Sequence, residues 1–173
     1  GIWLAKAPFS SSGRGILRLL ESDLKQSEKQ ILHGIIKKQK HVSIERFLQK
    51  KLDFAMEFFI HPNGNVSFEG YSLFRTNDKC SYSGNYLYTQ NDIRLIISKL
   101  IDIELLDKVQ GRLIEILSKE FNGIYTGYVG IDMLIYENER QNYLHPCIEM
   151  NVRNNMGNLA INLFDKYIDM TSK

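Results

Sequence analysis

Three side chains in the C-terminal part of the sequence have the chemistry of a metal-binding set. Asp132 lies in the apolar run 127–136, and Glu149 and Asn151 lie in the run 143–152. Side chains alternate along a strand, so Glu149 and Asn151 point to one face, and pairing of the two runs brings Asp132 there. Two carboxylates and an amide oxygen form the hard oxygen set that Mg²⁺ prefers. Because close carboxylates repel each other, a cation between them is the natural compensation.

Two cationic side chains could accompany this set. Arg153 follows Asn151 in the same alternation and is able to pair with a phosphate or a carboxylate through two hydrogen bonds. Lys6 ends a strand-like run and precedes the Ser- and Gly-rich loop 8–15, whose backbone N–H groups suit a phosphate. No Gly-Lys-Ser/Thr follows, so this is not a Walker loop. Taken singly, each feature also fits a surface loop or a hydrogen-bonded strand residue.

Apolar periodicity and turn residues predict the elements that position these groups. We predict strands over 2–7, 16–20, 42–48, 52–59, 66–74, 127–136 and 143–152, and helices over 23–40, 90–120 and 158–168. Ser22 and Asp23 are candidate caps for the first helix, and Asn63-Gly64 predicts a hairpin turn. The polar stretch 77–87 predicts a loop. This order predicts an α+β protein, with antiparallel β-sheets and helices packed on one side.

Other polar side chains carry weaker signals. Glu57 and Glu69 lie on the predicted hairpin strands, and Glu69 is the better candidate for facing a cleft, although a solvated position explains it as well. Cys147 has no recognisable partner acid or oxyanion loop, so packing explains it better than a nucleophilic role. Cys80 and Cys147 lie far apart, without metal or redox spacing, which predicts free thiols in a reducing, cytoplasmic compartment.

Length and charge limit the classes of partner. The chain has 173 residues, which fits one domain or two subdomains that share a cleft. Its net charge of +2 gives no argument for a nucleic-acid partner, and the basic run 37–40 is expected to be a solvated surface. No apolar run approaches the roughly 20 residues that cross a bilayer. We therefore expect neither a nucleic-acid nor a membrane partner.

The order of these features resembles the ATP-grasp superfamily over nearly the whole chain. The most specific parts are Lys6 with the loop after it, and Asp132 with Glu149-Met150-Asn151. Glu45-Arg46-Phe47-Leu48 occupies the place of the family's hinge. The resemblance implies ATP with Mg²⁺, or with Mn²⁺ in its place, bound in a nucleotide cleft between two subdomains. Residues 1–48 would form a partial nucleotide-binding subdomain, and residues 49–173 a metal-binding subdomain.

The resemblance also implies roles for individual residues. Contacts to the nucleotide are implied for Lys6, Ser11, Ser12, Gly13 and Gly15 at the phosphates, Glu45, Phe47 and Leu48 at the adenine, and Asp53 at the ribose. The implied metal ligands are Asp132, Glu149 and Asn151. Arg153 and Lys6 would face the reacting phosphate or carboxylate.

The function implied is that of an ATP-dependent carboxylate–amine ligase. Such an enzyme activates a carboxylate as an acyl-phosphate, which an amine then attacks, but no residue here identifies either substrate. The loop lacks the usual glycine doublet, and Asp53 stands where glutamate is common. Family members carry a further segment before Lys6, so we expect a piece of a longer chain that is inactive without the remainder. The alternatives are a non-catalytic nucleotide-binding module and a protein-interaction domain of the same fold.

Overall fold

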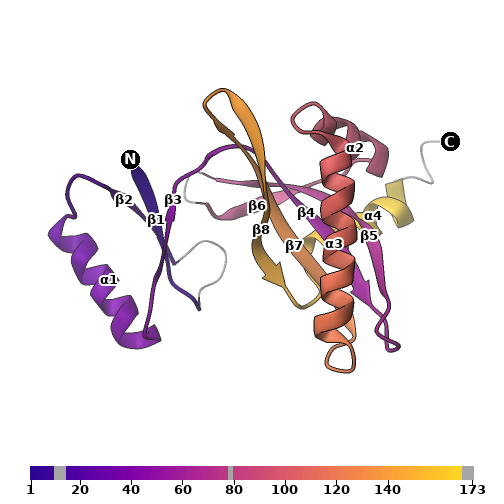
Figure 1. Cartoon of the computed structure of the whole chain (residues 1–173), viewed down its shortest axis with the longest axis horizontal. Helices are drawn as coiled ribbons and strands as arrows, with labels where there is room; N and C mark the ends of the chain where they lie inside the picture. The colour runs from indigo at the N-terminus through magenta and orange to yellow at the C-terminus, as the bar shows by residue number, and fades with distance from the viewer. Residues whose placement is uncertain (10–14, 78–79, 169–173) are drawn as a thin grey trace. The chain divides into compact units, whose positions relative to one another are not determined.

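The computed structural model describes residues 1–9, 15–77 and 80–168, and the chain divides into two units (Figure 1). One unit comprises Gly1–Gln49 and Thr76–Ser83, and the other comprises Lys50–Arg75 and Gly84–Lys173. The ligand-binding roles that we assigned to the two parts of the chain stay predictions.

The first unit is built on a three-stranded antiparallel sheet. Its strand order is β2–β1–β3, with β1 at Ile2–Lys6, β2 at Ile16–Leu20 and β3 at Ser43–Arg46. Helix α1 (Gln26–Gln39) connects β2 to β3. The Glu28 carboxylate closes its first turn by accepting a hydrogen bond from the Lys25 N–H at 2.8 Å. The predicted caps Ser22 and Asp23 are therefore wrong. The helix is capped at Lys25, whose backbone N–H is satisfied by the side chain of Glu28, three residues later.

The second sheet has five strands in the order β6–β5–β4–β7–β8. These strands are β4 (Gln49–Ile60), β5 (Val66–Thr76), β6 (Tyr82–Tyr86), β7 (Gly127–Asn138) and β8 (Gln141–Asn151). The loop predicted over 77–87 is wrong in its second half, which forms β6. An edge strand has few buried side chains, so its sequence lacks the apolar alternation on which the prediction depended.

The hairpin between β4 and β5 is confirmed. Its connection is longer than a two-residue turn, because Ile60 pairs with Val66. Gly64 has a φ of +81°, a backbone conformation that favours glycine, whereas Asn63 does not adopt a positive φ. A bulge between Glu57 and Phe58 shifts the register within the hairpin. Bulges of this kind re-aim side chains, and Glu57 is central to the site described below.

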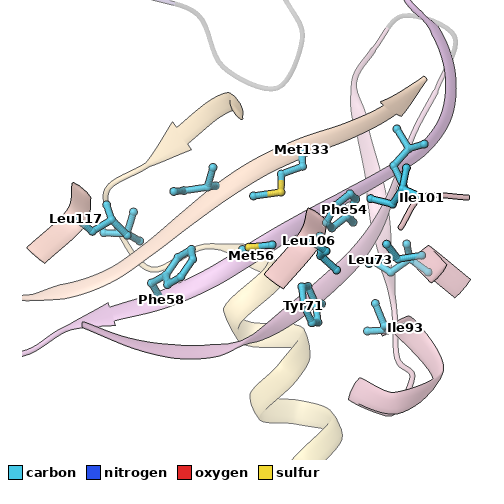
Figure 2. Close-up of a cluster of buried hydrophobic side chains, with 14 of the residues drawn as sticks. Phe54, Met56, Phe58, Tyr71, Leu73, Ile93, Ile101, Leu106, Leu117 and Met133 are labelled. Carbon is cyan, nitrogen blue, oxygen red and sulfur yellow. The ribbon is translucent and has the colours of Figure 1, made fainter. Parts of the chain in front are cut away.

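Two helices cover one face of the five-stranded sheet. The predicted helical stretch 90–120 forms α2 (Gln90–Ser98) and α3 (Ile103–Phe121), separated where Asp102 caps α3 by accepting from the Glu104 N–H at 2.9 Å. Figure 2 shows the buried apolar side chains between sheet and helices, among them Met56, Phe58, Leu106 and Leu117. Each such side chain contributes about 1.5–3 kcal/mol by leaving water. The predicted α+β class with antiparallel sheets is thus confirmed.

The opposite face of this sheet carries a third, shorter helix. Helix α4 (Met156–Leu163) continues into a π-helical turn, η1 (Phe164–Ile168). Gly157 in α4 lies against the side chains of Glu57 and Ser72, which point away from the apolar core. Helices therefore lie on both faces (Figure 1), and the predicted packing on one side holds for α2 and α3 but not for α4, which covers the polar face. Within the described residues, no helix is long and apolar enough to cross a membrane.

Candidate functional site

The polar face of the five-stranded sheet follows from strand alternation. On β7, Ile131 and Met133 are buried in the apolar core, so Asp132 between them points to the other face. On β4, Met56 and Phe58 belong to the same core, which places Glu57 on the same side as Asp132. The sequence thus directs these acids away from the apolar core under α2 and α3.

The strand register brings the predicted metal ligands together. Asp132 on β7 pairs with Glu149 on β8, and Gly130 pairs with Asn151, so the predicted pairing is confirmed. Beyond Asp132 the register shifts, because Leu134 pairs with His145 and two steps along β7 correspond to four along β8. An extra pair of residues leaves the alternation unchanged. The bulge accommodates Pro146, which has no N–H to donate and is tolerated on an edge strand.

Hydrogen bonds connect Asn151 with both an acid and a base. Its Nδ2 donates to Asp132 Oδ2 at 3.4 Å, and its Oδ1 accepts from Arg153 Nη2 at 3.0 Å. Arg153 Nη1 also donates to the backbone oxygen of Asn154 at 3.3 Å. In the ligand-free chain the guanidinium thereby holds the Asn151 amide with its nitrogen towards Asp132, and keeps its own charge next to the metal-ligand candidates.

The Asp132 carboxyl lies in an environment that disfavours its charged form. Burial is the largest cause and, with the neighbouring carboxylates of Glu149, Glu57 and Asp53, it raises the pKa of Asp132 to about 7. The hydrogen bond from Asn151 opposes this change. A cation beside Asp132 would offset both the repulsion and the loss of hydration, so this position is electrostatically suited to one.

This pKa predicts an unusual pH dependence of folding. Because the folded state binds the Asp132 proton more tightly than the unfolded state, the ligand-free chain gains stability as pH falls through 7. The gain approaches about 1.4 kcal/mol per pH unit between roughly pH 7 and pH 4. We expect the difference in unfolding free energy between the wild type and Asp132→Asn, measured by urea denaturation, to follow this slope. A pH-independent difference would contradict the prediction.

The chemistry of these donors fits a hard divalent cation. Asp132 and Glu149 supply carboxylate oxygens, and Asn151 supplies an amide oxygen. In the part of the chain that the structure describes, no three His, Cys, Asp or Glu side chains form a metal-binding group. Two carboxylates alone would not complete the coordination sphere of such a cation, so further oxygen ligands would be required, and the Asn151 amide oxygen is a candidate. The Asn151 amide must also rotate, because its nitrogen and not its oxygen faces Asp132.

Glu57 belongs to this site, although the sequence favoured Glu69. The Glu57 side chain is 1% exposed and raises the pKa of Asp132 by its charge. Its Oε1 accepts from Ser72 Oγ at 3.0 Å, and its Oε2 accepts from Asn155 Nδ2 at 2.8 Å. Glu69 is exposed and accepts instead from Ser67 Oγ at 2.5 Å. Glu57 alternates with the buried Met56 and Phe58, which was the available sequence signal.

The predicted nucleotide residues of the first unit form a separate group. Lys6 Nζ donates to Glu45 Oε2 at 2.5 Å, so the residues expected at the phosphate and at the adenine are ion-paired. The Phe47 N–H donates to Ile2 O at 2.9 Å, and the Arg18 guanidinium lies 4.1 Å from the Phe47 ring centroid. These contacts join the hinge segment to the three-stranded sheet. Their nucleotide roles, with that of the half-buried Leu48, stay predictions.

The predicted phosphate loop is described only at its two ends. Gly15 O accepts a hydrogen bond from the Ala7 N–H at 2.9 Å, which continues the pairing of β1 with β2. Ser11, Ser12 and Gly13 lie outside the described residues.

Asp53, predicted to contact the ribose, lies on β4 in the second unit. Its Oδ2 accepts from Lys50 Nζ at 2.5 Å, and its charge adds to those that raise the pKa of Asp132. Cys147, on the bulged part of β8, has a pKa raised by burial and by Asp132. A raised thiol pKa means less thiolate at neutral pH, and the expectation that Cys147 is not a nucleophile stays a prediction. Cys80 and Cys147 are free thiols, as predicted.

Comparison with solved structures identifies the fold. Biotin carboxylase from Campylobacter jejuni, in a β-γ-ATP complex, matches 95% of this chain with a TM-score of 0.58 and 18% identity. D-alanyl-alanine synthetase A from Vibrio cholerae matches all of it, with a TM-score of 0.57 and 16% identity. N5-carboxyaminoimidazole synthetase from Staphylococcus aureus, complexed with ADP, matches 89%, with a TM-score of 0.56 and 12% identity. The chain has the ATP-grasp fold.

The chain corresponds to only part of each of these proteins. It spans 37% of the biotin carboxylase, 48% of the D-alanyl-alanine synthetase and 35% of the N5-carboxyaminoimidazole synthetase. At identities between 12% and 18%, the likeness establishes the fold and leaves activity to be argued from the site. No protein-family model matches the sequence, and no curated protein matches it.

Proposed function

We propose that this ATP-grasp chain is the nucleotide- and metal-binding part of an ATP-dependent carboxylate–amine ligase. The observation that carries the proposal is the pairing of Asp132 with Glu149 beside Asn151, on the polar face of the five-stranded sheet. The solved structures of the same fold include ATP- and ADP-bound synthetases and carboxylases. A fold shared with nucleotide-binding enzymes and an oxygen-ligand set suited to Mg²⁺ support the same function.

In the reaction we propose, an oxygen of the substrate carboxylate attacks the γ-phosphorus of ATP. The bond from that phosphorus to the bridging oxygen breaks, ADP leaves, and an acyl-phosphate forms. The amine nitrogen then attacks the acyl carbon, the bond from that carbon to the phosphate oxygen breaks, and the nitrogen loses a proton. The products are an amide, ADP and inorganic phosphate.

The side chains of this site would supply charge and position. Asp132, Glu149 and Asn151 would hold Mg²⁺, which when bound offsets the negative charge of the nucleotide phosphates. Arg153 would pair with the reacting carboxylate or phosphate, since a guanidinium matches the geometry of either group. The Lys6 ammonium group, in the first unit, would also offset the negative charge of the nucleotide phosphates. We propose the contacts of Glu45, Phe47, Leu48 and Asp53 to the nucleotide on the resemblance alone.

A thermal-shift titration of the chain tests the nucleotide site. We expect ATP and a non-hydrolysable analogue to raise the melting temperature in the presence of Mg²⁺ and to have little effect in its absence. Saturation at 100 times the dissociation constant would stabilise the folded state by about 2.7 kcal/mol. GTP and inorganic triphosphate serve as ligand controls. A shift that does not depend on Mg²⁺, or no shift with ATP, would count against the proposal.

A further inference from the structure

Glu57 is a buried charge that the proposed reaction does not use directly. It lies on β4, is 1% exposed, and has a pKa raised by burial, which its two hydrogen bonds oppose. Burying a carboxylate is costly unless it is hydrogen-bonded, and each oxygen here has one donor: Ser72 on β5 and Asn155. Removing either donor would leave part of this buried carboxylate uncompensated, so the two hydrogen bonds are important for keeping it in place.

Two glycines leave room for this carboxylate. A Cβ atom on Gly130 of β7 would lie 2.7 Å from Glu57 Oε2 and 2.2 Å from Asn155 Nδ2. A Cβ atom on Gly157 of α4 would lie 2.0 Å from Glu57 Oε1 and 2.3 Å from Ser72 Oγ. Neither glycine has a positive φ, so close approach and not backbone conformation explains them. Gly130 of β7 and Gly157 of α4 thus leave space for the contacts of Glu57 with Asn155 and Ser72.

Asn155 connects Glu57 to the end of the metal-ligand segment. Its Oδ1 accepts from the Asn158 N–H at 3.0 Å and caps α4, while its Nδ2 donates to Glu57. Asn155 lies two residues after Arg153 and four after Asn151. The chain from Asn151 to Asn155 is therefore held at its start by pairing with β7 and at its end by Glu57.

We infer that Glu57 is a positioning residue, whose carboxylate holds Asn155 and thereby places Asn151 and Arg153 beside Asp132. The functional part of this inference rests on the proposed function, whereas the link between Glu57 and the segment 151–158 does not. The hydrogen bonds of Glu57 go to Ser72 and Asn155, which are not among the proposed metal ligands. Loss of a residue that is hydrogen-bonded directly to a metal ligand weakens metal binding about 10- to 100-fold, and Glu57 acts one step further out, through Asn155.

A reciprocal exchange of the two partners tests the inference. Asn155→Asp keeps a good helix cap but places a second carboxylate against Glu57, and the two repel each other. In the double variant Glu57→Gln with Asn155→Asp, the new amide donates to the new carboxylate and still accepts from Ser72. Glu57→Gln alone can keep both hydrogen bonds, with Ser72 as acceptor, and serves as the conservative control.

Two readouts separate the inference from the proposed function. Amide hydrogen exchange over 151–158 should be faster in Asn155→Asp and return to wild-type rates in the double variant, with exchange over 54–60 unchanged. Mg²⁺-dependent ATP binding should weaken at least about tenfold and recover in the same pattern. Equal exchange rates in the wild type, Asn155→Asp and the double variant would overturn the inference, and so would a double variant that does not return to wild-type rates. Absence of ATP binding by the wild type would instead count against the proposed function, because the exchange readout needs no ligand.

A second substitution keeps the test informative if Asn155→Asp unfolds. Asn155→Ser retains a hydroxyl that caps α4 but is too short to reach Glu57. Faster exchange over 151–158 in a folded Asn155→Ser protein supports the inference, and wild-type exchange contradicts it.

Discussion

Replacing Asp132 by asparagine is expected to abolish Mg²⁺-dependent nucleotide binding and, above pH 7, to make the ligand-free chain more stable. The two effects have one cause. The Asp132 carboxylate is disfavoured by burial and by the charges of Glu149, Glu57 and Asp53, and a bound cation would remove that penalty. Asparagine has the same shape and retains an oxygen that accepts from Asn151, but it carries no charge for a metal ion.

Substitution of Glu149 provides the matched comparison. Glu149 lies opposite Asp132 but is exposed, so Glu149→Gln should lose Mg²⁺-dependent binding and, by relieving its repulsion of Asp132, stabilise the ligand-free chain less than Asp132→Asn does. Glu137→Gln is the control on β7, since it removes a carboxylate that is paired with Lys51 at 2.7 Å, and it should leave ATP binding unchanged. Calorimetric titration with ATP and Mg²⁺ measures binding, and urea denaturation at pH 8 measures stability. Wild-type affinity in both Asp132→Asn and Glu149→Gln would exclude the proposed metal site.

Alternation along β7 and β8 was enough to predict the central part of this site. Asp132 and Glu149 interrupt apolar runs. Because side chains alternate along a strand, the position of each acid among its apolar neighbours predicts the face to which it points. The pairing then needed only that the charged turn between the runs be short, as it is, because Asn138 pairs with Gln141. The two extra residues near Pro146 did not affect this prediction, because an insertion of two residues leaves the alternation of side chains along β8 unchanged.

Glu57 shows what the sequence could not provide. Its partners Ser72 and Asn155 are 15 and 98 residues away, so the local sequence offered only the position of Glu57 between Met56 and Phe58 and not the hydrogen bonds that hold its carboxylate. The signals that identify it in the structure are Gly130 and Gly157, which look unremarkable in the sequence. A glycine in a strand or at the start of a helix acquires meaning only when its neighbour across the fold is known.

Errors at element ends and edges have a similar origin. Strand β6 is polar because an edge strand needs no apolar alternation, and α1 begins after Lys25 because Glu28 closes its first turn. Both outcomes depend on which backbone groups are left without partners, and that depends on tertiary structure. The acids of the candidate site were easier to predict because strand parity is a strictly local property.

Gly157→Ala is expected to destabilise the chain by about 3 kcal/mol, although helix propensity alone predicts a gain of about 1 kcal/mol. Gly157 lies in α4 with no positive φ, so alanine suits its backbone. The new methyl group would lie 2.0 Å from Glu57 Oε1 and 2.3 Å from Ser72 Oγ. We expect the carboxylate to resist displacement, because Asn155 donates to its other oxygen and the residue is almost fully buried.

Gly111→Ala in α3 is the matched control for this substitution. A Cβ atom at Gly111 would meet nothing within 4 Å, so the same chemical change should there stabilise the chain by up to about 1 kcal/mol. Urea denaturation of both variants gives the two signs directly. Equal stabilisation by both would mean that the Glu57 carboxylate has room to shift, and then its hydrogen bond to Asn155 could not hold the segment that carries Asn151 and Arg153. Opposite signs would instead measure how rigidly this buried carboxylate is held.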